Sequence, residues 1–439
     1  MSKILPHYFP PETKRGMFIV LPLKYSEKLK NLAEVREKLP SEVRDTQIDF
    51  NSGDFIQLMN DKCTRKGNFV RRYTLAIPEE LADGQIKDGN GKVLASLAFT
   101  NFQLFTFDNG IAFISALLEY PNSQTGAVYE FVKPGYNEND AMEPARAAFI
   151  DALENTNIVS DREDSPFTWF TKYNQTKHAD LLIKDAYRLN SAYSPIRFAS
   201  AEETQQVVYN EHRIINLNCQ FSDPSEHDVQ YFSGAKDVDD WKYGWGCAVT
   251  SQEVSYIYAP GRLESEITDT LADHANDDLL LLMLALYQKY ESMSINEQIH
   301  TRYSNLNRTK KSIYELKQEA MSLIAYETLA PSQISRWNNV CEIYKATLEL
   351  TGVDETIAEV KDKIEMLTAE QDRRDSKRDT AISTVITVFG LVSIIAAILQ
   401  TVDYLDSRSP VMWVSFFGSL AAVLVLGIYL GIRLGRKKG

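Results

Sequence analysis

Residues 381–402 read AISTVITVFGLVSIIAAILQTV, and residues 411–432 read VMWVSFFGSLAAVLVLGIYLGI. Each stretch has 22 residues without a formal charge and is rich in Ile, Val, Leu, Phe and Ala. An α-helix rises about 1.5 Å per residue, so each stretch is long enough to cross a hydrocarbon core of roughly 30 Å. The sequence therefore predicts two C-terminal transmembrane helices within residues 380–432.

The charges on either side of these stretches indicate their orientation. Arg373, Arg374, Lys377 and Arg378 precede the first stretch, and a basic cytosolic tail is expected at residues 433–439. The connector at residues 403–410 contains one Arg and two Asp. Basic residues concentrate on the cytosolic side of membranes. We therefore expect a multi-pass protein of the inner (cytoplasmic) membrane, with both termini in the cytosol.

The region before the spans, residues 261–379, predicts a helical stalk. Between residues 262 and 378, Gly352 is the only glycine and Pro331 is the only proline. Pro331 followed by Ser332 indicates a helix start that Ser332 could cap. Because a helix tolerates one glycine at some cost, we expect a continuous helix over residues 332–400, on the order of 100 Å long.

Apolar residues recur along this helix with the 3-4 spacing of a heptad seam. The seam consists of Ile343, Ala346, Leu350, Val353, Ile357, Val360, Ile364 and Leu367. Such spacing is typical of a helix packed along a partner. It predicts a homo-oligomer held along this seam, although the same residues could face the chain's own helices within residues 277–329.

The first apolar stretch has two different faces. One is mostly small or hydroxylated and is predicted to line a pore: Thr380, Ser383, Thr387, Gly390, Ile394, Ala397 and Thr401. The other is formed by Val385, Val388, Val392, Ile395 and Leu399. Small and hydroxyl residues also mark close packing between membrane helices, so packing explains the first face as well as pore lining does.

The first 260 residues predict an α+β cytosolic domain. A strand is expected at residues 15–24, and Asp108-Asn109-Gly110 between two apolar runs is a strong hairpin signal. A second hairpin is expected between residues 245–250 and 254–258. Helices are expected at residues 144–155, where Pro144 suits the first turn, and at residues 177–189.

Composition and motifs argue against several classes of function. The formal net charge of −13 disfavours broad nucleic-acid binding. The four cysteines are far apart and form no Cys-x-x-Cys pair, and the six histidines form no His-x-x-x-His pair. No P-loop and no Gly-x-Ser-x-Gly elbow is present. We therefore expect no enzyme. Acidic runs at residues 237–240 and 274–278 could collect divalent cations but define no metal site.

The complete layout resembles the CorA-like ion transporters and channels. The features that carry the resemblance are the acidic cytosolic domain, the long helix at residues 332–400 that enters the first of two spans, and the basic tail. The resemblance implies a funnel of five subunits, in which the long helix lines the stalk and then the pore. Residues 433–438 would form a collar around the neck.

One departure changes what the resemblance implies. The magnesium transporters of the family end their first span with Gly-Met-Asn, whereas this chain reads AILQTVD at residues 397–403. In this respect the chain is similar to a branch associated with type III CRISPR systems, which lacks the signature. That similarity implies an antiviral membrane effector gated by a nucleotide second messenger, in one lineage a conjugate of S-adenosylmethionine with AMP.

A nucleotide needs cations for its phosphates and flat side chains for its base. Lys172 lies near Trp169 and Tyr173 in the sequence, and Lys242 lies between Trp241 and Tyr243, with Trp245 just beyond. Arg146 offers a cation alone. These residues are the candidate ligand-binding residues, although cations next to core aromatic residues are more often simply solvated.

Two alternative functions remain. A divalent metal cation transporter of the magnesium type would need an acidic or polar ring, for which Asp403 and Asp406 are the candidates in the outer loop. A membrane-tethered binding or scaffold protein would need no pore.

Overall fold

A computed structural model of the chain describes most of its residues. They are 7–25, 29, 32–50, 52–63, 69–77, 81, 84–87, 91–132, 142–155, 158, 167–169, 186–217, 231–234, 243–260, 277–304, 310–324, 329–407, 414, 417, 418 and 421. The chain divides into two compact units, Met1–Lys361 and Asp362–Gly439.

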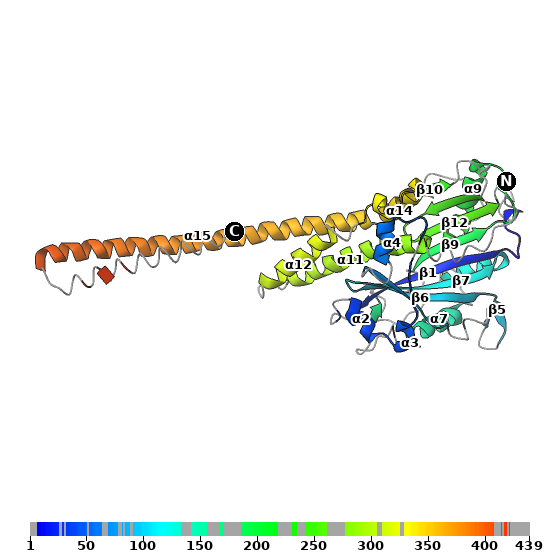
Figure 1. Cartoon of the computed structure of the whole chain (residues 1–439), viewed down its shortest axis with the longest axis horizontal. Helices are drawn as coiled ribbons and strands as arrows, with labels where there is room; N and C mark the ends of the chain where they lie inside the picture. Colours follow the sequence, from blue (N-terminus) through cyan, green and yellow to red (C-terminus); the bar gives the residue numbers. More distant parts are fainter. Residues whose placement is uncertain are drawn as a thin grey trace. The chain divides into compact units, whose positions relative to one another are not determined.

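The first unit is built on a mixed sheet (Figure 1). Within the described residues it has ten strands in the order β10-β11-β12-β9-β1-β7-β6-β3-β2, with β8 also pairing with β1. The strands are β1 (Lys14–Tyr25), β2 (Gln47–Ile48), β3 (Val70–Thr74), β6 (Ala98–Phe107), β7 (Ile111–Pro121), β8 (Phe167–Trp169), β9 (Tyr187–Tyr193), β10 (Tyr231–Gly234), β11 (Tyr243–Val249) and β12 (Glu253–Pro260). Strands β9 and β12 are parallel, and the other pairs are antiparallel. A separate hairpin joins β4 (Ile86–Lys87) to β5 (Val93–Ala95).

Helices cover both faces of the sheet. The helices that the structure describes are α2 (Leu32–Lys38), α3 (Ser41–Arg44), α4 (Gln57–Cys63), α6 (Thr125–Val132), α7 (Glu143–Asn155), α9 (Ala201–Leu217), α11 (Asp278–Ser304), α12 (Lys310–Ser322), α13 (Pro331–Ile334), α14 (Asn338–Leu350) and α15 (Val353–Ser407), with a 3-10 turn at Asn122–Gln124. An α+β domain followed by helices is therefore confirmed.

Alternation along β1 shows how the two faces are used, because successive strand residues point to opposite sides. Met17 and Ile19 belong to an apolar cluster shared with α2, α6 and α7. Phe18 and Val20 belong to a cluster on the other face, which includes residues of α4, α11 and α14. Helix α9 packs on β11 and β12 through a third cluster. The central strand is therefore buried on both sides.

The two predicted hairpins are confirmed. Strands β6 and β7 pair across Asp108-Asn109-Gly110, and Gly110 has a φ of +99°, a conformation that glycine adopts without steric cost. The Asn109 amide also donates a hydrogen bond of 2.7 Å to the hydroxyl of Tyr287 on α11. Strands β11 and β12 form the second hairpin. The strand predicted at residues 15–24 and the helix predicted at residues 144–155 are confirmed as β1 and α7.

The predicted helix at residues 177–189 is wrong at its C-terminal end. Tyr187–Tyr193 is strand β9, which pairs with β1 and β12. The rest of that range, as far as residue 185, lies outside the described residues. Both faces of β9 are buried, and Arg188 and Asn190 form buried polar contacts there. The strand therefore lacks the alternation between buried apolar and exposed polar residues by which a sequence usually reveals one.

The predicted continuous helix at residues 332–400 is also wrong. Gly352 separates α14 from α15 and has a φ of +78°, the left-handed conformation that ends many helices at a glycine. A second break follows α13, where Ser335 is extended and pairs with Phe55. Ser332 is not the cap, because the helix begins at Pro331 with Ala330 in the N-cap position. Helix α15 then continues beyond Gln400 to Ser407.

The first half of the heptad seam packs inside its own chain. Ile343, Val353 and Ile357 belong to the same apolar cluster as residues 279–287 of α11, and Val360 is fully buried. The Asn296 amide on α11 donates a hydrogen bond of 3.1 Å to the Glu359 carboxylate on α15. The helices expected to form a separate stalk therefore belong, as far as Lys361, to the same compact unit as the sheet.

Candidate membrane-spanning helix and ligand-binding residues

The second unit contains a helical segment that is apolar enough to cross a membrane. Ser376–Leu399 of α15 has 24 residues, a window of mean hydropathy 2.5 and no burial in that window. At about 1.5 Å per residue the segment extends roughly 36 Å, which exceeds a hydrocarbon core of about 30 Å. Its length and composition make it a candidate membrane span. A helix also suits lipid because its backbone groups form their hydrogen bonds within the helix.

Both faces of this segment are exposed in the single chain. Ile394, on the predicted pore-lining face, is 58% exposed, and Val388, on the opposite face, is 53% exposed. Of the other pore-lining candidates, Thr380, Ser383, Thr387 and Thr401 are exposed, and Gly390 and Ala397 are half-buried. An apolar helix exposed on all sides needs lipid or other helices around it.

The second predicted span lies mostly outside the described residues. Within residues 411–432 only residues 414, 417, 418 and 421 are described, and all four are helical and exposed. One candidate span, Ser376–Leu399, is therefore found among the described residues. The connector expected at residues 403–410 is helical as far as Ser407.

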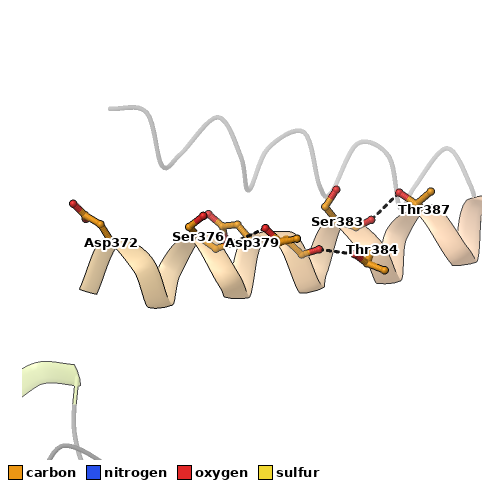
Figure 2. A pocket seen from close by; sticks show the side chains of 7 residues that line it. Asp372, Ser376, Asp379, Ser383, Thr384 and Thr387 are labelled. Atoms are coloured by element: carbon orange, nitrogen blue, oxygen red, sulfur yellow. Dashed lines mark hydrogen bonds between the residues drawn. The ribbon is translucent and has the colours of Figure 1, made fainter. Parts of the chain in front are cut away.

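Threonine hydroxyl groups on and just after the segment bond to their own helix. Thr380, Thr384 and Thr387 donate hydrogen bonds of 2.8 to 2.9 Å to the carbonyls of Ser376, Thr380 and Ser383, four residues earlier (Figure 2). Thr401 bonds in the same way to Ala397 at 2.7 Å. These hydroxyl groups can therefore enter lipid or a helix interface without an unpaired donor.

An open hollow follows this hydroxylated face towards the start of the segment. It is lined by Asp372, Ser376, Asp379, Thr380, Ser383, Thr384 and Thr387 (Figure 2). Asp372, Ser376 and Asp379 continue the predicted stripe upstream, because each lies three or four residues from the next along the helix. The sequence analysis did not include these three residues because it began the stripe at Thr380, after the last charged residue.

Arg146 is buried, with no exposed surface. Its guanidinium donates a hydrogen bond of 2.8 Å to the Glu130 carbonyl in the last turn of α6, where helix carbonyls lack partners within the helix. The arginine therefore joins α7 to the end of α6. It is not an accessible cation for a ligand, and this part of the predicted site is wrong.

The remaining ligand-binding candidates are described only in part. Lys172, Trp241 and Lys242 lie outside the described residues. Trp245 is on β11 and packs, half-buried, against the cluster beneath α11 and α14.

Buried polar residues, which the sequence did not reveal, lie between the sheet and α9. Arg15 on β1 forms a two-bond ion pair with Glu211 on α9, and Arg188 on β9 pairs with Glu253 on β12 at 3.2 Å. All four side chains are at most 2% exposed. Burial lowers the pKa of Arg15, but the charge of Glu211, the Tyr120 phenol and the hydrogen bonds to both together outweigh burial, so the net shift is upward. The pairs join residues 196 and 65 positions apart, so no local pattern predicts them.

Among the described residues, no group of three or more His, Cys, Asp or Glu side chains is arranged to hold a metal ion. The acidic run at residues 237–240 and most of the run at residues 274–278 lie outside them. No protein-family model matches the chain, and no curated protein matches it.

Proposed function

We propose that the chain is a homo-oligomeric membrane ion channel of the CorA-like kind. In this proposal the sheet domain binds a ligand, and α15 transmits the resulting conformational change to the membrane-spanning segment. The observation that carries the proposal is the Ser376–Leu399 segment, which is apolar, has no buried residue in its apolar window and is continuous with a helix that starts in the core of the sheet domain. Lipid and neighbouring copies would cover its surface.

The stripe from Thr380 to Thr401 supports a pore lined by α15. A single helix cannot enclose a pore, so several copies would place their stripes around a common axis. Ile394 is the only branched apolar residue on the stripe, and hydrophobic constrictions can close pores by excluding water. We therefore assign the gate to a ring of Ile394 side chains.

The ligand is proposed from the resemblance to the CRISPR-associated branch: a nucleotide messenger of the S-adenosylmethionine–AMP type. A ligand opens a channel only by binding the open state more tightly than the closed state. Because Arg146 is buried in the domain, Lys172, Lys242, Trp241 and Trp245 are the residues to test. A site between subunits would couple binding to the pore most directly.

Ion flux through full-length protein reconstituted in liposomes tests the proposal. We expect potassium flux that rises when the conjugate is added. Flux should become ligand-independent in Ile394→Ser, whereas Ile395→Ser on the opposite face should behave as wild type. Magnesium flux without any nucleotide would favour the divalent-cation transporter. No flux above that of protein-free liposomes would reject both ion-conducting functions and favour a membrane tether.

A further inference from the structure

A cluster of charged residues lies on α15 immediately before its apolar segment. Asp372, Arg373, Lys377, Arg378 and Asp379 are all exposed there. The five lie within eight residues, so they occupy about two helical turns. The acidic residues and the basic residues lie on different faces of the helix.

The basic residues share a face with the apolar side chains. Lys377 and Arg378 lie four and three residues before Ala381, and each later position is three or four residues from the next, which places the bases on either side of one apolar face. The face comprises Lys377 and Arg378, then Ala381, Val385, Val388, Val392, Ile395 and Leu399. It is therefore cationic at one end and apolar along the rest.

The acidic residues share the hydroxylated face. Asp372 and Asp379 line the same hollow as Ser383 and Thr387 (Figure 2). By the spacing of 3.6 residues per turn, Val388 and Ile395 lie on the other side of the helix. Phosphate groups repel carboxylates and attract cations. The face with Lys377 and Arg378 therefore suits anionic headgroups, whereas the face with Asp372 and Asp379 repels them.

Lys377 and Arg378 also lie at the depth at which lipid headgroups are expected. Residues 381–400 are 20 residues long, which is about the length that a 30 Å hydrocarbon core requires. Lys377 and Arg378 lie one turn before this stretch, at the level of the headgroups. Long basic side chains extend towards that level while their stems stay beside apolar surface.

We propose that Lys377 and Arg378 bind the phosphate headgroups of anionic phospholipids in the cytosolic leaflet, and that the Val385–Leu399 face of α15 contacts their acyl chains. This inference rests on the membrane insertion that the proposed function also requires, but not on ion conduction. It fixes the rotation of α15 about its own axis, with the Asp379 and Ser383 side turned away from lipid.

The test measures lipid binding by full-length protein in a non-ionic detergent. Phosphatidylglycerol is titrated, with phosphatidylcholine and inorganic phosphate as separate probes, and bound lipid is counted by native mass spectrometry. We expect Lys377→Gln with Arg378→Gln to weaken phosphatidylglycerol binding roughly 25-fold, about fivefold for each charge removed. The matched control, Lys345→Gln with Lys361→Gln, removes two exposed charges away from the apolar segment and should bind as wild type.

Two further measurements keep the outcomes distinct. Lys377→Arg with Arg378→Lys keeps both charges and should keep the binding, which guards against loss through misfolding.

Alkaline extraction of membranes tests insertion: release of the wild-type chain would contradict both the proposed function and this inference. If the chain stays in the membrane, the inference alone is overturned by any of three results. These are unchanged binding in Lys377→Gln with Arg378→Gln, equal loss in the control, or equal binding of phosphatidylcholine.

Discussion

Glu211 places a carboxylate from α9 against Arg15 in the interior of the sheet domain. Removing one partner of a buried ion pair leaves the other charge without compensation, which costs about 3–5 kcal/mol. We therefore expect Glu211→Ala to lower the free energy of unfolding by that amount, measured by denaturant unfolding in detergent. Gln205→Ala, at an exposed site on the same helix, should change it by less than about 0.5 kcal/mol. Equal effects of the two variants would contradict this prediction.

Buried tyrosines should make the domain sensitive to alkaline pH. Burial raises the pKa of Tyr25, Tyr120, Tyr256 and Tyr344 well above the ordinary value near 10. A raised pKa in the folded state means that the unfolded chain loses its protons first as the pH rises. The stabilisation is therefore complete below about pH 10 and is lost progressively above it.

The measurement is a pH titration of tyrosinate absorbance together with thermal unfolding. We expect the melting temperature to fall above about pH 10, and the buried tyrosines to ionise only as the protein unfolds. If all tyrosines ionised together near pH 10 without unfolding, the burial of these four phenols would be contradicted.

At the scale of elements, Gly352 decides where α14 ends and α15 begins. Its positive φ is strained for residues with a Cβ, at a cost of about 1–2 kcal/mol. Gly352→Ala should therefore destabilise the domain by about that amount in a denaturant unfolding experiment. Gly126→Ala in α6, where φ is ordinary and no atom lies within 4 Å of the added Cβ, should be neutral or stabilising by up to about 1 kcal/mol. The same sign for both variants would count against this role of Gly352.

The two faces of the apolar segment should differ in access to water. Cysteines at Ser383, Thr387 and Ile394 should react with a membrane-impermeant thiol reagent in the open channel. Cysteines at Val388 and Ile395 should be protected by lipid. The rates of modification in liposomes give the comparison, and equal rates on both faces would reject the assignment of the stripe to the pore.

The elements that the sequence predicted have strong local signals. Asn109-Gly110 specifies the β6–β7 turn by backbone conformation alone, and Pro144 suits the first turn of α7. Strand β9 was missed because its polar residues are buried through partners far away in the sequence. The burial of Arg146 was missed for the same reason, because its acceptor is a backbone carbonyl at the end of another helix. The apolar segment was predicted because its length and composition identify a candidate span without reference to any other part of the fold.

At the scale of the whole molecule, we expect full-length protein in detergent to be a homo-oligomer with about five times the single-chain mass of 49.9 kDa. Light scattering measures this mass, and a single-chain mass would contradict the prediction. The first half of the seam is not a suitable place for substitutions that test the assembly. Ile357→Asp would put a charge into the chain's own core and should unfold the domain, so loss of the oligomer in that variant would carry no information about the interface.

The position of β1 in the sheet also affects how the protein is made. The strand leaves the ribosome before its neighbours β7 and β9, which begin only at Ile111 and Tyr187. At about 5–20 residues per second, the delay after Tyr25 is on the order of 10 seconds before either neighbour is complete. During that interval an apolar strand with two open edges can pair with other nascent chains. Until β7 or β9 is complete, the strand is therefore exposed to mispairing.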